Sequence, residues 1–201
     1  MEITTAMVKE LRQATAAGIL DCRKALEVAE GDFDKAVDWL REKGLAKAAK
    51  RVDREAKDGL VVSYVHGGGR IGVLVEVNCE TDFVARTDEF KTMVNDIALQ
   101  IAAMSPRYVK REDIPAAVLE HERQLYRAQA LDEGKPEAVV DRIVDGRMEK
   151  YYKEVCLLEQ AFIRDEERTI DDLIKEQITK TGENMVLRRF ARFELGESLG
   201  Q

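Results

Sequence analysis

Three consecutive glycines, residues 67–69, stand between two segments rich in β-branched residues. The segment before them, 60–65, reads LVVSYV, and in the segment after them every second residue from 71 to 77 is isoleucine or valine. Alternation with a period of two is typical of a strand with one buried face, and glycine accepts the positive φ of a tight turn at little cost. The pattern therefore predicts an antiparallel β-hairpin over residues 60–78.

The same glycines also match a dinucleotide-binding pattern, because Gly67, Gly69 and Gly72 have the spacing GxGxxG. That fingerprint binds a pyrophosphate only when it follows a strand and opens a helix, whose N-terminus then meets the phosphates. Here the residues after Gly72 have the pattern of a strand. We therefore expect turn glycines at this point and no bound cofactor.

Helical periodicity flanks the hairpin on both sides. Apolar residues at helical spacing predict three short helices in the first 43 or so residues, with Gly44 interrupting the third. They also predict one helix from Asp88, a helical hairpin over 115–131 and 136–158, and a helix from Thr169, which has the spacing of a capping box with Asp172. The last block alternates again as a strand, and on one face it carries Leu187, Ala191, Phe193 and Leu195.

These elements predict an α+β fold with two domains. Residues 1–55 would form a three-helix bundle followed by a basic helical linker. Residues 56–201 would form an α+β core domain, with a small three-stranded antiparallel sheet and packed helices that include the helical hairpin. The bundle resembles the ubiquitin-associated fold in its core and turn residues, which are Ala25, Leu26, Gly31, Asp32, Ala36, Val37, Trp39 and Leu40.

The linker region, residues 43–57, is locally basic. Its alanines favour a helix, and six basic residues stand against Asp53 and Glu55. Two interpretations stay open, a solvated linker or an electrostatic contact with an acidic partner or RNA. The basic residues are Lys43, Lys47, Lys50, Arg51, Arg54 and Lys57.

Composition excludes several classes of protein. The chain has 32 Lys and Arg against 39 Asp and Glu, a net charge of -7 that argues against a dedicated nucleic-acid binder. Two histidines, His66 and His121, and three separated cysteines make a zinc site or a disulfide framework improbable. No stretch approaches the roughly 20 apolar residues of a membrane span. We expect a cytoplasmic protein with no metal, no cofactor and no membrane partner.

Two short segments are not explained by the predicted core. Ile19 and Leu20 follow Gly18 in a predicted loop, where they either tuck into the bundle or form a contact patch. Residues 76–86, EVNCETDFVAR, leave a strand and precede a helix. In one interpretation Thr81 and Asp82 cap a helix and Phe83 turns into the core. In the other, the loop presents an acid and an aromatic side chain to a partner.

A third possibility for that segment, Cys79 as a nucleophile, finds no support. Nothing in the sequence places His66 or His121 beside it. We expect a small buried residue at the end of a strand.

Three separated blocks of the sequence resemble the elongation factor Ts family of bacteria. The blocks are residues 76–86, residues 11–26 (LRQATAAGILDCRKAL) and the C-terminal segment 182–194, GENMVLRRFARFE. Ala16 and Arg23 depart mildly from the family pattern, which commonly has glycine and lysine there. The likeness covers essentially the whole chain, and the chain looks like a short form with one copy of the core subdomain.

The resemblance implies a guanine-nucleotide exchange factor for elongation factor Tu, the GTPase that delivers aminoacyl-tRNA. Such a factor is not an enzyme with covalent chemistry of its own. The resemblance implies that Thr81, Asp82, Phe83 and Val84 wedge between helices of the GTPase domain and dislodge the Mg²⁺ bound with the nucleotide. It further implies that Arg12, Ile19 and Leu20 grip the same domain, and that the chain pairs as a homodimer without binding nucleic acid.

Two other hypotheses remain. The first is an adaptor whose N-terminal bundle captures a peptide or helix without accelerating any exchange. The second is a nucleotide-dependent enzyme that uses Gly67, Gly69 and Gly72. Stimulated release of GDP from elongation factor Tu would separate the exchange factor from both.

Overall fold

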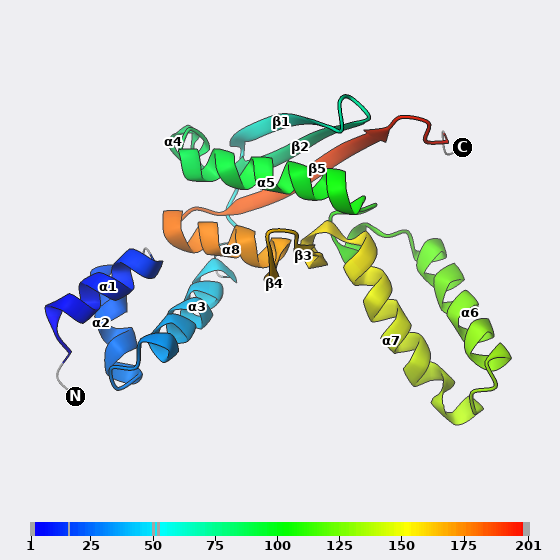
Figure 1. Cartoon of the computed structure of the whole chain (residues 1–201), viewed down its shortest axis with the longest axis horizontal. Helices are drawn as coiled ribbons and strands as arrows, with labels where there is room; N and C mark the ends of the chain where they lie inside the picture. The colour runs from blue at the N-terminus through cyan, green and yellow to red at the C-terminus, as the bar shows by residue number, and fades with distance from the viewer. Residues whose placement is uncertain (1–2, 16, 50, 52, 199–201) are drawn as a thin grey trace. The chain divides into compact units, whose positions relative to one another are not determined.

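The computed structural model describes residues 3–15, 17–49, 51 and 53–198. It has the predicted α+β composition, with helices at the N-terminus and a small sheet formed later in the chain (Figure 1). Ala16 and Lys50, named in the sequence analysis, lie outside the described residues. No helix in the described part of the chain is long and apolar enough to cross a membrane.

The N-terminal region is a bundle of α1 (Thr5–Thr15), α2 (Ile19–Val28) and α3 (Phe33–Ala49), drawn in blue to cyan in Figure 1. Its helices pack around small and apolar side chains, and this close packing lets a short segment bury a core. The likeness to the ubiquitin-associated fold stays a prediction. The fully buried members of this core are Leu11, Cys22, Ala25, Leu26 and Ala36.

Two details of the bundle differ from the predictions. Ile19 and Leu20 do not lie in a loop, because they form the first turn of α2. Gly44 does not end the third helix, which continues to Ala49. A Cβ atom at position 44 would lie 2.8 Å from Cγ2 of Thr179, so glycine serves here for close approach to another helix and not for a helix end.

The predicted basic linker is helical only in its first half. After α3 ends at Ala49, the described residues 53–57 adopt turn and irregular structure. Alanine-rich sequence favours a helix but does not enforce one where other contacts hold the backbone. The prediction of a helix over all of 43–57 is therefore wrong for residues 51 and 53–57.

The sheet has three antiparallel strands in the order β1–β2–β5, as predicted. β1 (Asp58–His66) and β2 (Ile71–Cys79) form the hairpin, and β5 (Met185–Glu194) adds the C-terminal strand. Gly67, Gly68 and Gly69 all have positive φ, from 61° to 92°. The glycine motif therefore forms a turn that leads into a strand, which confirms the structural interpretation.

One face of the sheet is buried and the other is open. Val73, Val75 and Val77 of β2 are buried, while Leu74 is exposed. The part of α5 (Asp88–Met104) from Lys91 onward runs along the buried side in Figure 1, and its carbonyl at Ala102 accepts a hydrogen bond from Arg192 (3.5 Å). The predicted apolar face of β5 is only partly right, because Leu187 is buried but Phe193 and Leu195 are exposed.

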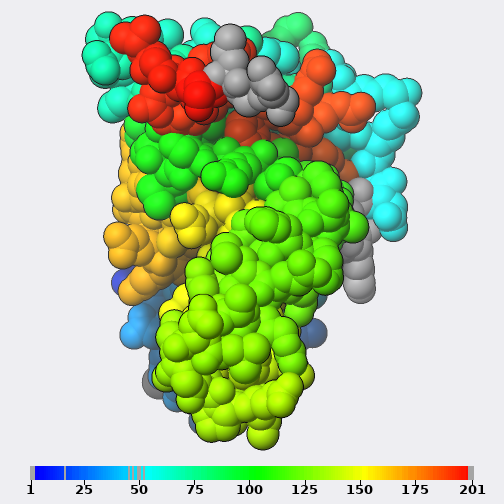
Figure 2. All heavy atoms as spheres, turned by 90° about the vertical axis from the view of Figure 1, so that its right-hand side faces the viewer, coloured from blue at the N-terminus to red at the C-terminus, as the bar shows by residue number. Residues whose placement is uncertain are grey.

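The helical hairpin is present as α6 (Ala116–Asp132) and α7 (Glu137–Val155), and Figure 2 shows it nearest the viewer in green to yellow-green. Its two helices pack through Ala130 and a row of α7 residues that includes Val140, Val144 and Met148. Helical spacing also predicts Leu125, Leu131 and Val139 on the contact face of this hairpin, but all three are exposed.

Helix α8 (Ile170–Thr181) begins with the predicted capping box. The Thr169 N–H donates to Asp172 Oδ2 and the Asp172 N–H donates to Thr169 Oγ1, each at 3.1 Å. The helix is followed by Gly182, whose φ of 80° turns the chain toward β5. A small antiparallel pair, β3 (Ala161–Phe162) and β4 (Asp165–Thr169), precedes α8 and was not predicted.

The contacts of the chain divide it into two compact units. The first combines residues 1–59, 78–90 and 173–186, and the second combines residues 60–77, 91–172 and 187–201. Both groups of predicted partner-binding residues belong to the first unit. The domain boundary after residue 55 stays a prediction.

Candidate partner-binding site

The segment that joins β2 to α5 contains a single helical turn, α4 (Asp82–Ala85). Its backbone closes through the Ala85 N–H, which donates to the Thr81 carbonyl at 3.3 Å, and through the Arg86 N–H, which donates to the Asp82 carbonyl at 3.1 Å. So short a helix has little stability of its own, because nucleation costs more than one turn of hydrogen bonds returns. Its position must therefore depend on what holds its ends.

Phe83 points away from the protein, with 80% of the residue exposed. This excludes the interpretation in which Phe83 turns into the core. The inward residue of the turn is Ala85, which is buried, and Val84 is half-buried beside it. A ring so exposed contributes little to the fold of the free chain and can bury its surface against a partner, as aromatic hot-spot residues do.

Asp82 lies next to this ring and pairs with Arg86 one turn later, at 2.7 Å between Oδ2 and Nη2. Both side chains remain largely exposed, so the pair contributes little to stability. The carboxylate is therefore available for exchange to another partner. The loop presents an acid and an aromatic group together, as the second sequence interpretation proposed.

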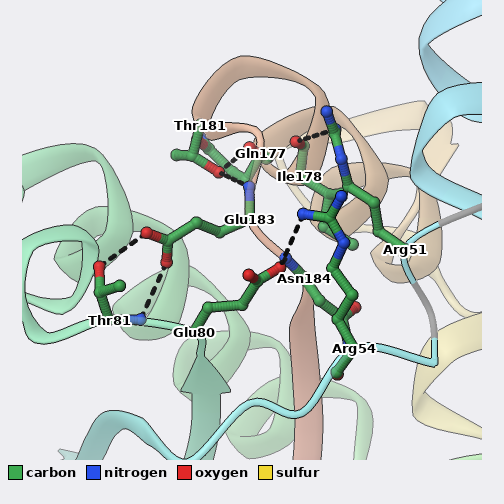
Figure 3. A network of polar contacts seen from close by, with 9 residues as sticks. All are labelled: Arg51, Arg54, Glu80, Thr81, Gln177, Ile178, Thr181, Glu183 and Asn184. Atoms are coloured by element: carbon green, nitrogen blue, oxygen red, sulfur yellow. Dashed lines mark hydrogen bonds and ion pairs between the residues drawn. The ribbon is translucent and has the colours of Figure 1, made fainter.

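Thr81, directly before the helical turn, is fastened to a residue far away in the sequence. Its N–H donates to Glu183 Oε2 at 3.0 Å, and its hydroxyl donates to Glu183 Oε1 at 2.6 Å (Figure 3). Among the described residues, the Thr81 side chain makes no capping bond to α4. The plain helix-cap interpretation of Thr81 is thus wrong, because its hydroxyl is engaged elsewhere.

The neighbouring residues make a second, reciprocal connection. The Asn184 N–H donates to Glu80 Oε1 at 2.6 Å, and Arg54 Nη1 lies 3.5 Å from the same oxygen. The buried Asn184 also donates through Nδ2 to the Arg54 carbonyl at 2.7 Å. Figure 3 shows that these bonds join three segments, which follow α3, β2 and α8.

Cys79, at the end of β2, is fully buried and its thiol donates to the Thr81 carbonyl at 3.1 Å. Burial raises the pKa of this thiol to about 11, and the nearby charge of Glu183 acts in the same direction. A neutral thiol is a poor nucleophile, so Cys79 is the buried strand-end residue that the sequence predicted. His66 and His121 are both exposed.

The second group of predicted residues lies on the N-terminal bundle. Arg12 is exposed on the last turn of α1, and Ile19 and Leu20 are exposed by 56% and 82% in the first turn of α2. The next turn buries Cys22, so α2 rests on the bundle core through other positions and leaves these two free. This favours the contact-patch interpretation over burial in the core.

The residues that hold the loop could not be predicted from the sequence. Glu80, Glu183 and Asn184 all lie inside the blocks that carry the family resemblance, but neither the pattern nor the resemblance gives them a role. Their spacing carries no local signal, because 102 residues separate Thr81 from Glu183. The structure makes their pairing visible.

No group of three or more His, Cys, Asp or Glu side chains in the described part of the chain is arranged to hold a metal ion.

Comparison with known proteins places this geometry in context. The sequence model of the family described as Elongation factor TS matches residues 2–197. The chain is 64% identical over 197 residues to the elongation factor Ts of Thermoanaerobacter sp. (strain X514), covering 98% of this chain and 97% of that protein. It is 61% identical over 199 residues to the protein of the same name from Carboxydothermus hydrogenoformans, covering 99% and 92%. The corresponding protein of Moorella thermoacetica is 58% identical over 199 residues, covering 99% and 98%.

Proposed function

Because the chain belongs to the elongation factor Ts family, we propose that it is a guanine-nucleotide exchange factor for elongation factor Tu. It would bind nucleotide-free Tu better than GDP-bound Tu and, by thermodynamic reciprocity, weaken GDP binding by the same factor. No covalent step is needed. The observation that carries the proposal is the exposed Phe83 beside Asp82, on a loop clamped at Thr81.

In the proposed mechanism the 81–84 loop acts on the nucleotide site of Tu. Phe83 would insert between helices of the GTPase domain, which buries an aromatic ring that is otherwise in water. Asp82 would exchange Arg86 for polar groups of the rearranged partner, while Thr81 and Val84 flank the wedge. Mg²⁺ bridges nucleotide phosphates to protein oxygens, so loss of its supports removes much of the affinity for GDP.

The bundle would supply a second attachment. Arg12 offers a guanidinium, and Ile19 with Leu20 offers apolar area, on elements that are separate from the loop. Two linked contacts hold the loop at a high effective concentration near its target. The partner of this surface is a protein, in keeping with the acidic charge of the chain, and we propose no nucleic-acid or membrane partner. We expect the chain to act in the cytoplasm, where Tu works.

We also propose that the chain pairs as a homodimer through the core domain. The support is the open face of the sheet, where apolar side chains are exposed on all three strands, at Val61, Val65, Leu74 and Phe193. The solvated face of an antiparallel sheet normally carries polar residues, so these exposed apolar side chains support an interface there. Sedimentation equilibrium should give twice the chain mass, and a monomer at micromolar concentration would contradict the dimer.

The exchange function is tested by release of a fluorescent GDP analogue from Tu. Substoichiometric amounts of the chain, with excess unlabelled GDP, should accelerate release over many turnovers. An adaptor would bind Tu, or another protein, without acceleration, and that result would overturn the proposal.

The role of Mg²⁺ is tested by repeating this assay in EDTA. Intrinsic release rises when Mg²⁺ is removed, so the extra acceleration by the chain should shrink. Undiminished acceleration in EDTA would contradict the displacement of Mg²⁺ by the loop.

A further inference from the structure

We propose that Glu183 is a positioning residue for nucleotide exchange, which fixes the direction in which α4 presents Phe83. The inference rests on the proposed function and assigns a role to a half-buried residue that lies outside the loop. Glu183 acts through Thr81 and is not itself expected to touch the GTPase.

The geometry is that of one carboxylate binding two donors of one residue. Oε1 accepts the Thr81 hydroxyl at 2.6 Å and Oε2 accepts the Thr81 N–H at 3.0 Å. Both bonds involve an ionised acceptor and are stronger than neutral ones. Together they hold the backbone and the side chain of Thr81, which leaves this residue little freedom to rotate.

Thr81 is the residue from which the helical turn starts, so its orientation is passed on to the next two residues. α4 has only four residues and cannot keep its direction without support at both ends. The far end is held by buried Ala85 and by the Thr87 hydroxyl, which donates to the Val84 carbonyl at 2.8 Å. Glu183 supplies the support at the near end, because it binds Thr81, which stands one residue before Asp82 and two before Phe83.

Glu183 is itself held in place by the local backbone and by its neighbour. Gly182 has a φ of 80°, which ends α8 and turns the chain so that Glu183 faces the loop. The Glu183 N–H donates to Thr181 Oγ1 at 3.3 Å, and the N–H of the next residue, Asn184, donates to Glu80 Oε1 at 2.6 Å. The segment after α8 thus supplies the carboxylate of Glu183 to Thr81, and the segment after β2 supplies the carboxylate of Glu80 to Asn184. This pair of opposed bonds resists sliding of one segment along the other.

A positioning role and a merely stabilising role predict different kinetics. A variant that only unfolds part of the population lowers the active concentration, so more protein is needed to reach the same limiting release rate. A variant with a misplaced loop still reaches Tu through the bundle but releases GDP more slowly even at saturation. The limiting rate and the half-saturating concentration therefore separate the two roles.

The experiment measures single-turnover release of the fluorescent GDP analogue from Tu with the full chain in excess, over a range of concentrations. Glu183→Ala removes both bonds and should lower the limiting rate about tenfold or more, as expected for losing charge-assisted bonds. Glu183→Gln should be intermediate, since its amide oxygen can accept the Thr81 N–H and its NH₂ can donate to the hydroxyl oxygen. Glu166→Gln, at an exposed position on β4, is the matched control for charge and should equal wild type.

Hydrogen exchange of the free protein supplies a readout that does not depend on Tu. The Thr81 amide should exchange faster in Glu183→Ala than in wild type, while amides in the core of α5 keep their protection. Unchanged protection at Thr81 would show that the clamp does not hold the loop, and would overturn the inference.

The kinetic outcomes also separate this inference from the function on which it rests. If wild type accelerates release and Glu183→Ala has the same limiting rate, with or without a shift in half-saturation, the positioning role is wrong and the exchange function stands. If wild type itself fails to accelerate release, the proposed function is overturned.

Discussion

The two ends of β2 are built on different principles. At the start of the strand, the turn 67–70 closes with the Arg70 N–H donating to the His66 carbonyl at 3.1 Å, and a Cβ atom at Gly68 or Gly69 would meet no described atom within 4 Å. At the other end, the 80–84 segment is held by bonds to residues more than 100 positions later. The turn is a local structure, whereas the loop depends on the tertiary fold.

The turn has a structural role alone, whereas the loop at the other end of β2 carries the proposed function. The turn carries glycines and needs nothing beyond positive φ. The loop carries an exposed aromatic ring that would be a liability unless its direction were controlled. A recognition loop that must enter a partner is best fixed before binding, because ordering it at the moment of contact would cost affinity.

The largest expected effect on this end of β2 comes from removing a core side chain that follows the loop in the sequence. Phe90, two residues into α5, is 1% exposed, and its N–H donates to Thr87 Oγ1 at 3.3 Å. We expect Phe90→Ala to lower the free energy of unfolding by about 3–5 kcal/mol, as for other large-to-small core changes. Urea unfolding followed by circular dichroism measures this. A loss below about 1 kcal/mol would mean that the loop is not anchored by this core.

Phe83 should behave in the opposite way from Phe90. Phe83→Ala removes a ring that makes few contacts in the free protein, so stability should change by no more than about 0.5 kcal/mol. Its loss should slow stimulated GDP release by roughly 30-fold or more, the cost of about 2 kcal/mol or above at an aromatic hot spot. Asp82→Ala should have a smaller effect in the same direction. Release rates equal to wild type in both variants would contradict the role assigned to the loop.

A substitution in the turn should lower the stability of the chain but leave its effect on GDP release unchanged. Gly68 has a φ of 68°, so Gly68→Ala should cost about 1 kcal/mol of stability through backbone strain. Gly72→Ala is the matched control, since this glycine lies within β2, outside the positive-φ glycines, and a Cβ there would meet no described atom within 4 Å. Thermal unfolding of the two variants tests the contrast. Gly68→Ala should leave GDP release unchanged, and a defect in release would remove the functional distinction between the two ends.

A further expected effect is a dependence of stability on alkaline pH from Cys79. Below pH 9 the thiol is protonated in both folded and unfolded chains and its contribution to stability is fully present. As the pH rises, the unfolded chain loses this proton first, and the folded chain keeps it up to a pKa of about 11. Stability should therefore fall between pH 9 and 11, more steeply in wild type than in Cys79→Ser. Equal slopes in the two proteins would show that the thiol is not protected by burial.

Much of the fold could be predicted because its signals are short-range. The glycine turn, the capping box of Thr169 and Asp172, and the helical hairpin each follow from residues within a few positions of one another. The errors occurred where a distant contact overrides local preference. Gly44 looks like a helix end but is a point of close approach to Thr179. A different error affects Leu125 and Leu131, which have the helical spacing of core residues but are exposed in the hairpin.

The candidate site was predicted in part for the same reason. Thr81, Asp82, Phe83 and Val84 were singled out by resemblance, whereas pattern alone favoured a helix cap with Phe83 turned into the core, and the 80% exposure of Phe83 contradicts that. Burial is a property of the packed molecule, because it depends on which other segments cover a given face. The outward direction of Phe83 and the two-point hold on Thr81 are therefore tertiary observations.

By itself, the sequence determined the β-hairpin, the C-terminal strand and most of the helices of this protein, the family to which it belongs and the segment that carries its proposed activity. Those properties are encoded in periodicity, in backbone preferences and in contiguous motifs. Only the tertiary structure decided that Glu183 binds Thr81 and that Glu80 binds Asn184. A carboxylate has no preferred partner along the chain, and its hydrogen bonds form with the donors that folding brings within about 3 Å.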